Sequence, residues 1–179
     1  DIRLFKLDNF TMPGAVSESD ALPPGYLREG VVLAGSATSV DSRSTGAELE
    51  SKWTDQGVLF GSLGRLVKEH GDVIRPHLMT RAFSRDFDRF AALHAACWSG
   101  GTLLYVPRGV VVDEPFHALS AISPGGADFG HTLVILEEGA EATMLTETAS
   151  GDDSVGLHCG GIELIVAPGA NLRYVNLQN

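Results

Sequence analysis

The feature of this sequence that most constrains its fold is a repeat with a period of 30 residues. Laid in rows, the three units read GGTLLYVPRGVVVDEPFHAL, GHTLVILEEGAEATMLTETA and GGIELIVAPGANLRYVNLQN, and no gap is needed to align them. Apolar columns also agree in kind, as at Leu104, Val134 and Leu164. Two columns are occupied by glycine in all three units, at Gly100, Gly130 and Gly160 and at Gly109, Gly139 and Gly169.

A fixed period of this size is typical of proteins in which each unit buries its apolar face against the next. Each unit predicts two strands separated by a turn at the second glycine, where an unusual backbone angle costs glycine little. Equivalent strands then pair in parallel, about 4.8 Å apart. We therefore predict a mainly β fold, a β-helix, with its first turns in residues 100–179. An antiparallel sandwich whose spacing is coincidental stays open.

The segments before the repeat differ from it in composition. Residues 1–45 contain most of the loop signals, such as MPG and LPPGY, and predict an extended lead-in. Residues 46–99 have apolar side chains at steps of three and four, which predicts a helical amino-terminal region. Its last helix is expected from about Arg85 to Trp98, with Ser84 as the N-cap and Phe87 on its apolar face. The third repeat unit reaches the last residue, so we expect its strand edges to be covered by further sequence or by another chain.

Charge and composition exclude several classes of function. Residues 110–179 carry ten acidic groups and one basic residue, Arg173, so this part repels nucleic acid. No apolar run is long enough to cross a membrane, and the two cysteines, Cys97 and Cys159, stand far apart. We therefore expect a cytoplasmic protein that binds neither nucleic acid nor membrane.

The repeat also brings candidate metal ligands together. His117 shares a column with Glu147, and Asp128 shares one with His158, which predicts two contacts between neighbouring strands. Cys159 follows His158, and thiolate and imidazole both bind iron and zinc. The candidate metal-site residues are thus His117, His158 and Cys159, although no spacing for four ligands emerges. No nucleophile elbow or phosphate-binding loop occurs, so no catalytic residue is predicted.

Several stretches resemble the SufB/SufD family of iron-sulfur cluster assembly proteins. They are DQGVLFGSLGRLVKEH, FAALHAACWSGGTLLYVPRGVVVDEPFHAL, HTLVILEEGAEATMLTE and ELIVAPGANLRYVNLQN, and the similarity covers about residues 55–179. SufB proteins often carry a cysteine after the second repeat strand, where this chain has MLTETAS with Thr148 near that place. The departure makes the resemblance SufD-like more than SufB-like.

The resemblance implies a right-handed parallel β-helix behind a helical amino-terminal region. It also implies a non-catalytic scaffold subunit that pairs with a SufB/SufD-type paralogue and binds a SufC-type ATPase. An iron-sulfur cluster is then expected at the level of the whole complex, because the family's cluster-building groups lie in a carboxy-terminal part beyond these residues.

Two other classes of function stay open. A carbohydrate-acting β-helix enzyme would need clustered acids and aromatic platforms, of which the repeats offer Tyr105 and Tyr174. A cupin-like metal-binding protein would bind metal through His117 or His158.

Overall fold

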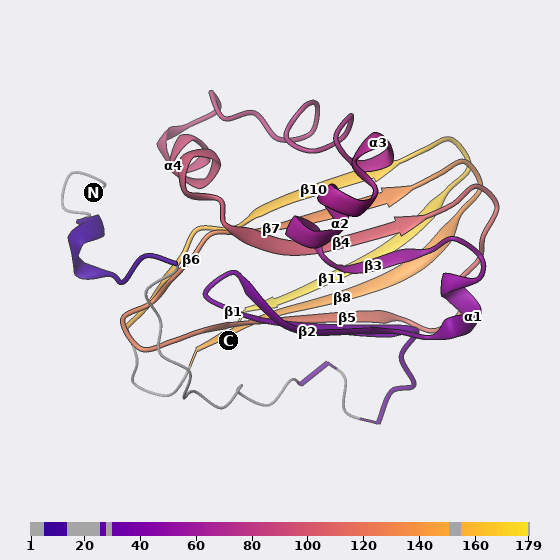
Figure 1. Cartoon of the computed structure of the whole chain (residues 1–179), viewed down its shortest axis with the longest axis horizontal. Coiled ribbons are helices and arrows are strands. Elements are labelled where there is room, and N and C mark those ends of the chain that lie inside the picture. Colours follow the sequence, from indigo (N-terminus) through magenta and orange to yellow (C-terminus); the bar gives the residue numbers. More distant parts are fainter. Residues whose placement is uncertain (1–5, 14–25, 28–29, 151–154, 179) are drawn as a thin grey trace.

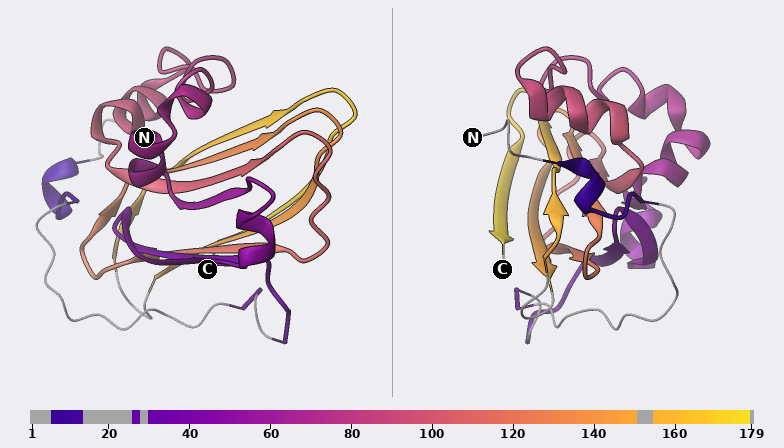
Figure 2. Two further views of the ribbon diagram at one scale, coloured as in Figure 1. Left: turned by 45° about the vertical axis from the view of Figure 1, so that its right-hand side comes forward. Right: turned by 90° about the vertical axis from the view of Figure 1, so that its left-hand side faces the viewer.

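The structure is a computed structural model that describes residues 6–13, 26–27, 30–150 and 155–178. Part of the predicted lead-in over residues 1–45, including most of the LPPGY loop signal, lies outside these ranges. Two large β-sheets face each other, and helices lie against the outer side of one of them (Figures 1 and 2).

The larger sheet has five strands, of which the first four in spatial order are parallel and the last is antiparallel to its neighbour. The polar hairpin of its last two strands forms one edge. In spatial order the strands are β11 (Asn171–Gln178), β8 (Glu141–Ser150), β5 (Phe116–Ile122), β1 (Gly35–Val40) and β2 (Arg43–Leu49).

The second large sheet has four strands, and again the last one is antiparallel. The order is β10 (Gly161–Val166), β7 (Gly130–Leu136), β4 (Gly100–Val106) and β3 (Leu59–Ser62). A short parallel pair, β6 (Ala127–Asp128) and β9 (Leu157–His158), lies between the two large sheets along the chain.

Four short helices and one 3-10 turn complete the described elements. They are η2 (Leu7–Asn9), α1 (Ser51–Thr54), α2 (Leu63–Glu69), α3 (Gly71–Ile74) and α4 (Arg89–Cys97). Within the described ranges, no helix has the length and apolar character needed to cross a membrane.

Helix α4 begins later than the sequence predicts. Its N-cap is Asp88, whose carboxylate accepts a hydrogen bond from the N–H of Ala91 at 2.7 Å, whereas Ser84 belongs to a turn before the helix. Phe87 therefore lies outside the helix and is 84% exposed, so the expectation that it packs on the apolar face is wrong.

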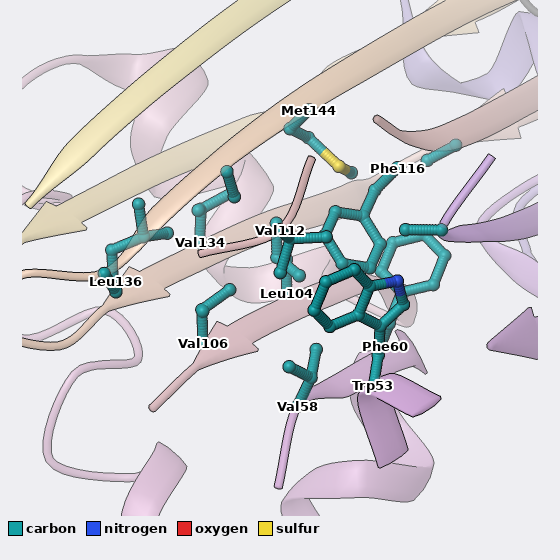
Figure 3. Close-up of a cluster of buried hydrophobic side chains, with 14 of the residues drawn as sticks. Trp53, Val58, Phe60, Leu104, Val106, Val112, Phe116, Val134, Leu136 and Met144 are labelled. Carbon is teal, nitrogen blue, oxygen red and sulfur yellow. The ribbon is translucent and has the colours of Figure 1, made fainter. Parts of the chain in front are cut away.

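Apolar side chains from both large sheets fill the space between them (Figure 3). Phe60 on β3 contacts Phe116 on β5, with ring centroids 5.0 Å apart, and Trp53 of α1 lies beside them. A second cluster lies on the outer face of the four-stranded sheet, where Leu63 and Leu66 of α2 cover Leu103 and Leu133. Strands β4 and β7 are thus buried on both faces, which explains why they are almost continuously apolar.

The turns between paired strands have the backbone that the glycine column predicts. Gly109, Gly139 and Gly169 each have a φ of 70°, in the left-handed region that favours glycine. The turns also bond to one another, because the N–H of Gly109 donates to the carbonyl of Glu138.

The parallel pairing of consecutive units is confirmed, but the predicted fold class is wrong. The described chain is mixed α/β, and each large sheet contains both parallel and antiparallel neighbours, so it is not a right-handed parallel β-helix. The reason lies in residues 35–62, which the repeat does not include. They form β1, β2 and β3, and the antiparallel members of both sheets come from this segment. The division into 1–45, 46–99 and 100–179 stays a prediction.

The register between strands is not uniform. In the four-stranded sheet Gly100 pairs with Gly130, an offset of 30 residues. In the five-stranded sheet Phe116 pairs with Met144, an offset of 28, because the segment before β5 is two residues longer than its counterpart before β8. The side chains that meet across β5 and β8 are therefore shifted from the columns of the aligned sequence.

Candidate functional site

Three buried carboxylates, each bonded to a histidine on a neighbouring parallel strand, are the most polar part of the described interior. Glu147 of β8 bonds to His117 of β5, Asp128 of β6 to His158 of β9, and Glu163 of β10 to His131 of β7. Burying a carboxylate is costly unless it is paired, so each group indicates a specific function in the fold or in its chemistry.

Glu147 binds a segment far away in the sequence. One of its oxygens lies 2.8 Å from His117 Nε2, and its two oxygens accept the N–H groups of Tyr26 and Leu27 at 2.7 and 2.6 Å. Burial alone raises the pKa of Glu147, but these hydrogen bonds outweigh it and hold the pKa below its ordinary value. The carboxylate is thus ionised at neutral pH and has three hydrogen-bond partners.

Asp128 joins four parts of the chain. It accepts hydrogen bonds from the Ser42 hydroxyl at 2.6 Å, the Gly130 N–H at 2.9 Å and the Ser120 hydroxyl at 3.1 Å, and it contacts His158 Nδ1 at 2.8 Å. Burial alone raises the pKa of Asp128, yet the bonds from His158, Ser42 and Gly130 lower it overall.

Glu163 stands in the otherwise apolar strand GIELIV and is fully buried. His131 Nε2 lies 3.0 Å from one carboxylate oxygen, and the N–H groups of Met79 and Phe83 donate at 2.6 and 3.0 Å. These bonds hold the pKa of Glu163 below its ordinary value although burial, the largest effect, raises it. His131 is bonded in turn to His94 of α4.

The three residues predicted as metal ligands occupy different environments. His158 and Cys159 line a cavity of about 320 Å³, together with Glu147, Ser120, Thr132 and Thr146. His117 does not line it and lies fully buried behind Glu147. The predicted contacts of His117 with Glu147 and of His158 with Asp128 are confirmed.

Cys159 has the properties of a packed thiol. It belongs to a small apolar cluster with Ala127 and Phe129, against which Cys97 of α4 also packs, and its Sγ lies 3.6 Å from the carbonyl of Phe90. Burial raises the pKa of the Cys159 thiol, which disfavours the thiolate that binds metals or attacks electrophiles.

The described residues contain no group of three or more His, Cys, Asp or Glu side chains placed to hold a metal ion. Each of the three carboxylates accepts donors from the protein, and these bonds hold separate chain segments together. Sequence reasoning missed His94, His131 and Glu163. A glutamate inside an apolar strand was the available signal for Glu163, but helix α4 supplies His94 from outside the repeat.

The fold and site define a mixed α/β protein whose buried polar groups hold its own segments together. Comparison with known proteins gives the family. The SufBD core domain of the SUF system for FeS cluster assembly matches residues 119–179, and the SufBD protein N-terminal region matches residues 36–117. The chain belongs to the SufBD family of iron-sulfur cluster assembly proteins, as the resemblance predicts.

Individual relatives agree with this assignment. Over 149 residues the chain is 31% identical to an iron-sulfur cluster assembly SufBD family protein of Staphylococcus saprophyticus and 32% identical to one of Staphylococcus epidermidis. It is 33% identical to the iron-sulfur cluster assembly protein SufB of Bacillus subtilis. Each alignment covers 82% of this chain and 32% of the relative, so the chain spans about a third of the length of the curated relatives it matches.

Proposed function

We propose that this chain is the amino-terminal part of a scaffold subunit that assembles iron-sulfur clusters within a SufBCD-type complex. The observation that carries the proposal is the match to both SufBD regions, which together extend over residues 36–117 and 119–179. In this proposal the cluster is the cargo of the whole complex, and its ligands come from parts of the complex other than the described residues.

A structural role agrees with the chemistry of the buried carboxylates. Glu147 and Glu163 each bind a histidine and two backbone N–H groups, so neither of these carboxylates is free to act as a base or a nucleophile. We therefore propose that the subunit is non-catalytic and that ATP hydrolysis belongs to a SufC-type partner.

The far edge of the two sheets offers apolar surface for further sequence of the subunit or for another chain. Several large apolar side chains there are between 38% and 45% exposed, and they come from β10 and β11, namely Ile162, Leu164, Val166 and Val175. Exposed apolar side chains on edge strands are typical of a surface that other protein covers, either further sequence of the same subunit or another chain.

The paralogue that pairs with this subunit is proposed to be of the SufB/SufD type. Thr148 near the place of the SufB cysteine favours a SufD-like subunit, which stays a prediction because a relative named SufB is among the matches. The cytoplasm is the proposed compartment, in agreement with two cysteines that are both free thiols.

Co-purification tests this proposal directly. The full-length subunit is co-expressed with a SufC-type ATPase and a SufB/SufD-type paralogue, and the mixture is analysed by size-exclusion chromatography with light scattering. We expect a complex of all three, with ATP hydrolysis that requires the ATPase subunit. A monodisperse full-length subunit that binds neither protein contradicts the proposal.

A glycan-cleaving enzyme and a cupin-like metal protein were the alternatives from the sequence. The first depended on a β-helix, which the sheet topology contradicts. The second depended on His117 or His158 as ligands, and in each histidine one ring nitrogen is bonded to a carboxylate. No observation on the described residues favours either one.

A further inference from the structure

A chain of hydrogen bonds runs through the outer face of the four-stranded sheet and joins four separate segments. His94 Nδ1 of α4 lies 2.8 Å from the carbonyl oxygen of Cys159, and His94 Nε2 lies 3.0 Å from His131 Nδ1. His131 Nε2 lies 3.0 Å from Glu163, which accepts the N–H groups of Met79 and Phe83. Both histidines and the glutamate are buried.

Counting protons along this chain shows that neutral histidines cannot satisfy it. A carbonyl oxygen only accepts, so His94 Nδ1 must carry hydrogen, and in the neutral ring His94 Nε2 is then an acceptor. His131 Nδ1 must donate to it, which leaves His131 Nε2 as an acceptor facing the carboxylate of Glu163. Two acceptors 3.0 Å apart are repulsive, so the network needs one more proton.

Three groups are possible carriers of this proton. Glu163 is a poor carrier, because its oxygens accept two backbone N–H groups and its pKa lies below the ordinary value. Burial lowers the pKa of His94, whose partner on the far side is a neutral carbonyl. His131 is the ring that directly contacts the carboxylate, where an imidazolium is best stabilised.

We infer that His131 is a buried imidazolium, and that this single proton locks the segment Met79–Phe83 and helix α4 onto the four-stranded sheet. The inference is independent of the proposed role in cluster assembly. The buried charge of His131 then has a conformational function.

The locked segment has no regular secondary structure. Residues 75–88 connect α3 to α4 and contain no helix or strand of their own, and Met79 has a φ of 53°, which is unfavourable for a side chain other than glycine. Glu163 supplies acceptors to two of its N–H groups. The ring of Phe83 packs edge-on against His94 and His131, with centroids 5.2 and 5.6 Å away.

Gly161 shows how closely the two histidines approach the sheet. A Cβ atom at this position would lie 2.6 Å from both His131 Nδ1 and His94 Nε2, the two atoms that bond to each other. An alanine there forces the rings apart without requiring an unusual backbone angle. Gly64 in α2 has no atom within 4 Å of such a Cβ, so it provides a matched control.

Other charged groups bear on the chain from the elements packed against it. The negative charge of Asp128 on β6 raises the pKa of His94. The neighbouring His158 on β9 lowers it. Arg81 and Arg85 of the connecting segment are exposed, as is Arg89 at the start of α4. The carboxylate that His131 contacts directly is that of Glu163.

Nuclear magnetic resonance of the full-length protein with nitrogen-15 in its histidines tests the inference. The His131 signals are assigned by their loss in His131→Gln. We expect both ring nitrogens of His131 to be protonated at neutral pH, and Glu163→Gln to return the ring to a neutral form. A neutral His131 in the wild type overturns the inference, wherever the extra proton lies.

Hydrogen exchange measures the lock itself, after correction for the intrinsic effect of pH. In Gly161→Ala the N–H groups of Met79 and Phe83 should exchange at least about tenfold faster, the factor expected for loss of a hydrogen bond to a charged group, while Gly64→Ala leaves them unchanged. Exchange at Met79 and Phe83 that stays unchanged in Gly161→Ala overturns the inference. The nitrogen-15 measurement on the wild type does not depend on any variant and decides the charge of His131 even where Gly161→Ala does not fold.

Discussion

His117 and Glu147 bond at 2.8 Å although they are not paired residues of their two strands. His117 faces Leu145 in the register, and Glu147 lies two positions further along β8. His131 and Glu163 have the same relationship, because His131 faces Gly161 and Glu163 lies two positions further along β10. In both sheets a histidine thus supports, diagonally, a glutamate that binds the N–H groups of an irregular segment.

Removing the Glu147 carboxylate should destabilise the protein strongly. Glu147→Ala leaves His117 and the N–H groups of Tyr26 and Leu27 without their acceptor, and we expect a loss of about 3 kcal/mol in the free energy of unfolding. Denaturation in urea measures it. The control is Glu138→Ala, which removes an exposed ion pair with Arg108 and should change stability by less than about 0.5 kcal/mol. Equal losses in the two variants would contradict a specific role for Glu147.

Stability should fall on acidification because the pKa values of Glu147, Glu163 and Asp128 are all lowered in the folded protein. A group with a lowered folded pKa stabilises the fold above its unfolded pKa, and the contribution disappears as pH falls through the folded pKa. For the two glutamates the loss therefore begins below the ordinary value of 4.5. Urea midpoints between neutral pH and pH values of about 3 measure it. Glu147→Gln should flatten this dependence, and an unchanged slope would show that Glu147 does not contribute.

The repeated strands could be predicted from the sequence because the turns between them have a positive φ, which favours glycine and so leaves a regular glycine column. The hairpin of β1 and β2 was missed, since its small polar residues resemble a loop, and its pairing is imposed by β5 and by buried contacts of the turn. His117 and Glu147 share a column, so their contact could be predicted. His94 could not be placed beside His131, because a separate helix brings it there and no local pattern records how that helix packs.

Replacing Gly139 should measure how much its left-handed backbone conformation costs another residue. A Cβ there would meet only the Cα of Gly109 at 3.9 Å, which is ordinary contact, so the main cost is expected from the φ of 70°. Gly139→Val should lower stability by about 1–3 kcal/mol, because a branched side chain rarely adopts this conformation. Gly139→Asn should cost clearly less, since asparagine tolerates it. Thermal unfolding of the two variants decides the point, and equal losses would contradict the explanation.

The turn between β1 and β2 offers a prediction that opposes local preference. Asp41 and Ser42 have φ values of 45° and 69°, as in a type I′ hairpin, where Asn-Gly is the favoured pair. Both side chains have buried partners, however. Asp41 accepts the N–H and hydroxyl of Ser123 at 3.0 and 2.6 Å, and Ser42 Oγ donates to Asp128 and accepts the N–H of Phe129 at 2.7 Å.

We therefore expect Asp41→Asn combined with Ser42→Gly to destabilise the protein by about 2–4 kcal/mol, although it improves the turn, because buried hydrogen bonds to charged groups are lost. Ser42→Ala separates the two effects. It removes the same hydroxyl but keeps the strained φ, so it should be less stable than Ser42→Gly by about 1 kcal/mol. Urea denaturation measures all three variants. A double variant as stable as the wild type would mean that turn geometry, and not the contacts with Ser123 and Asp128, determines the stability of this hairpin.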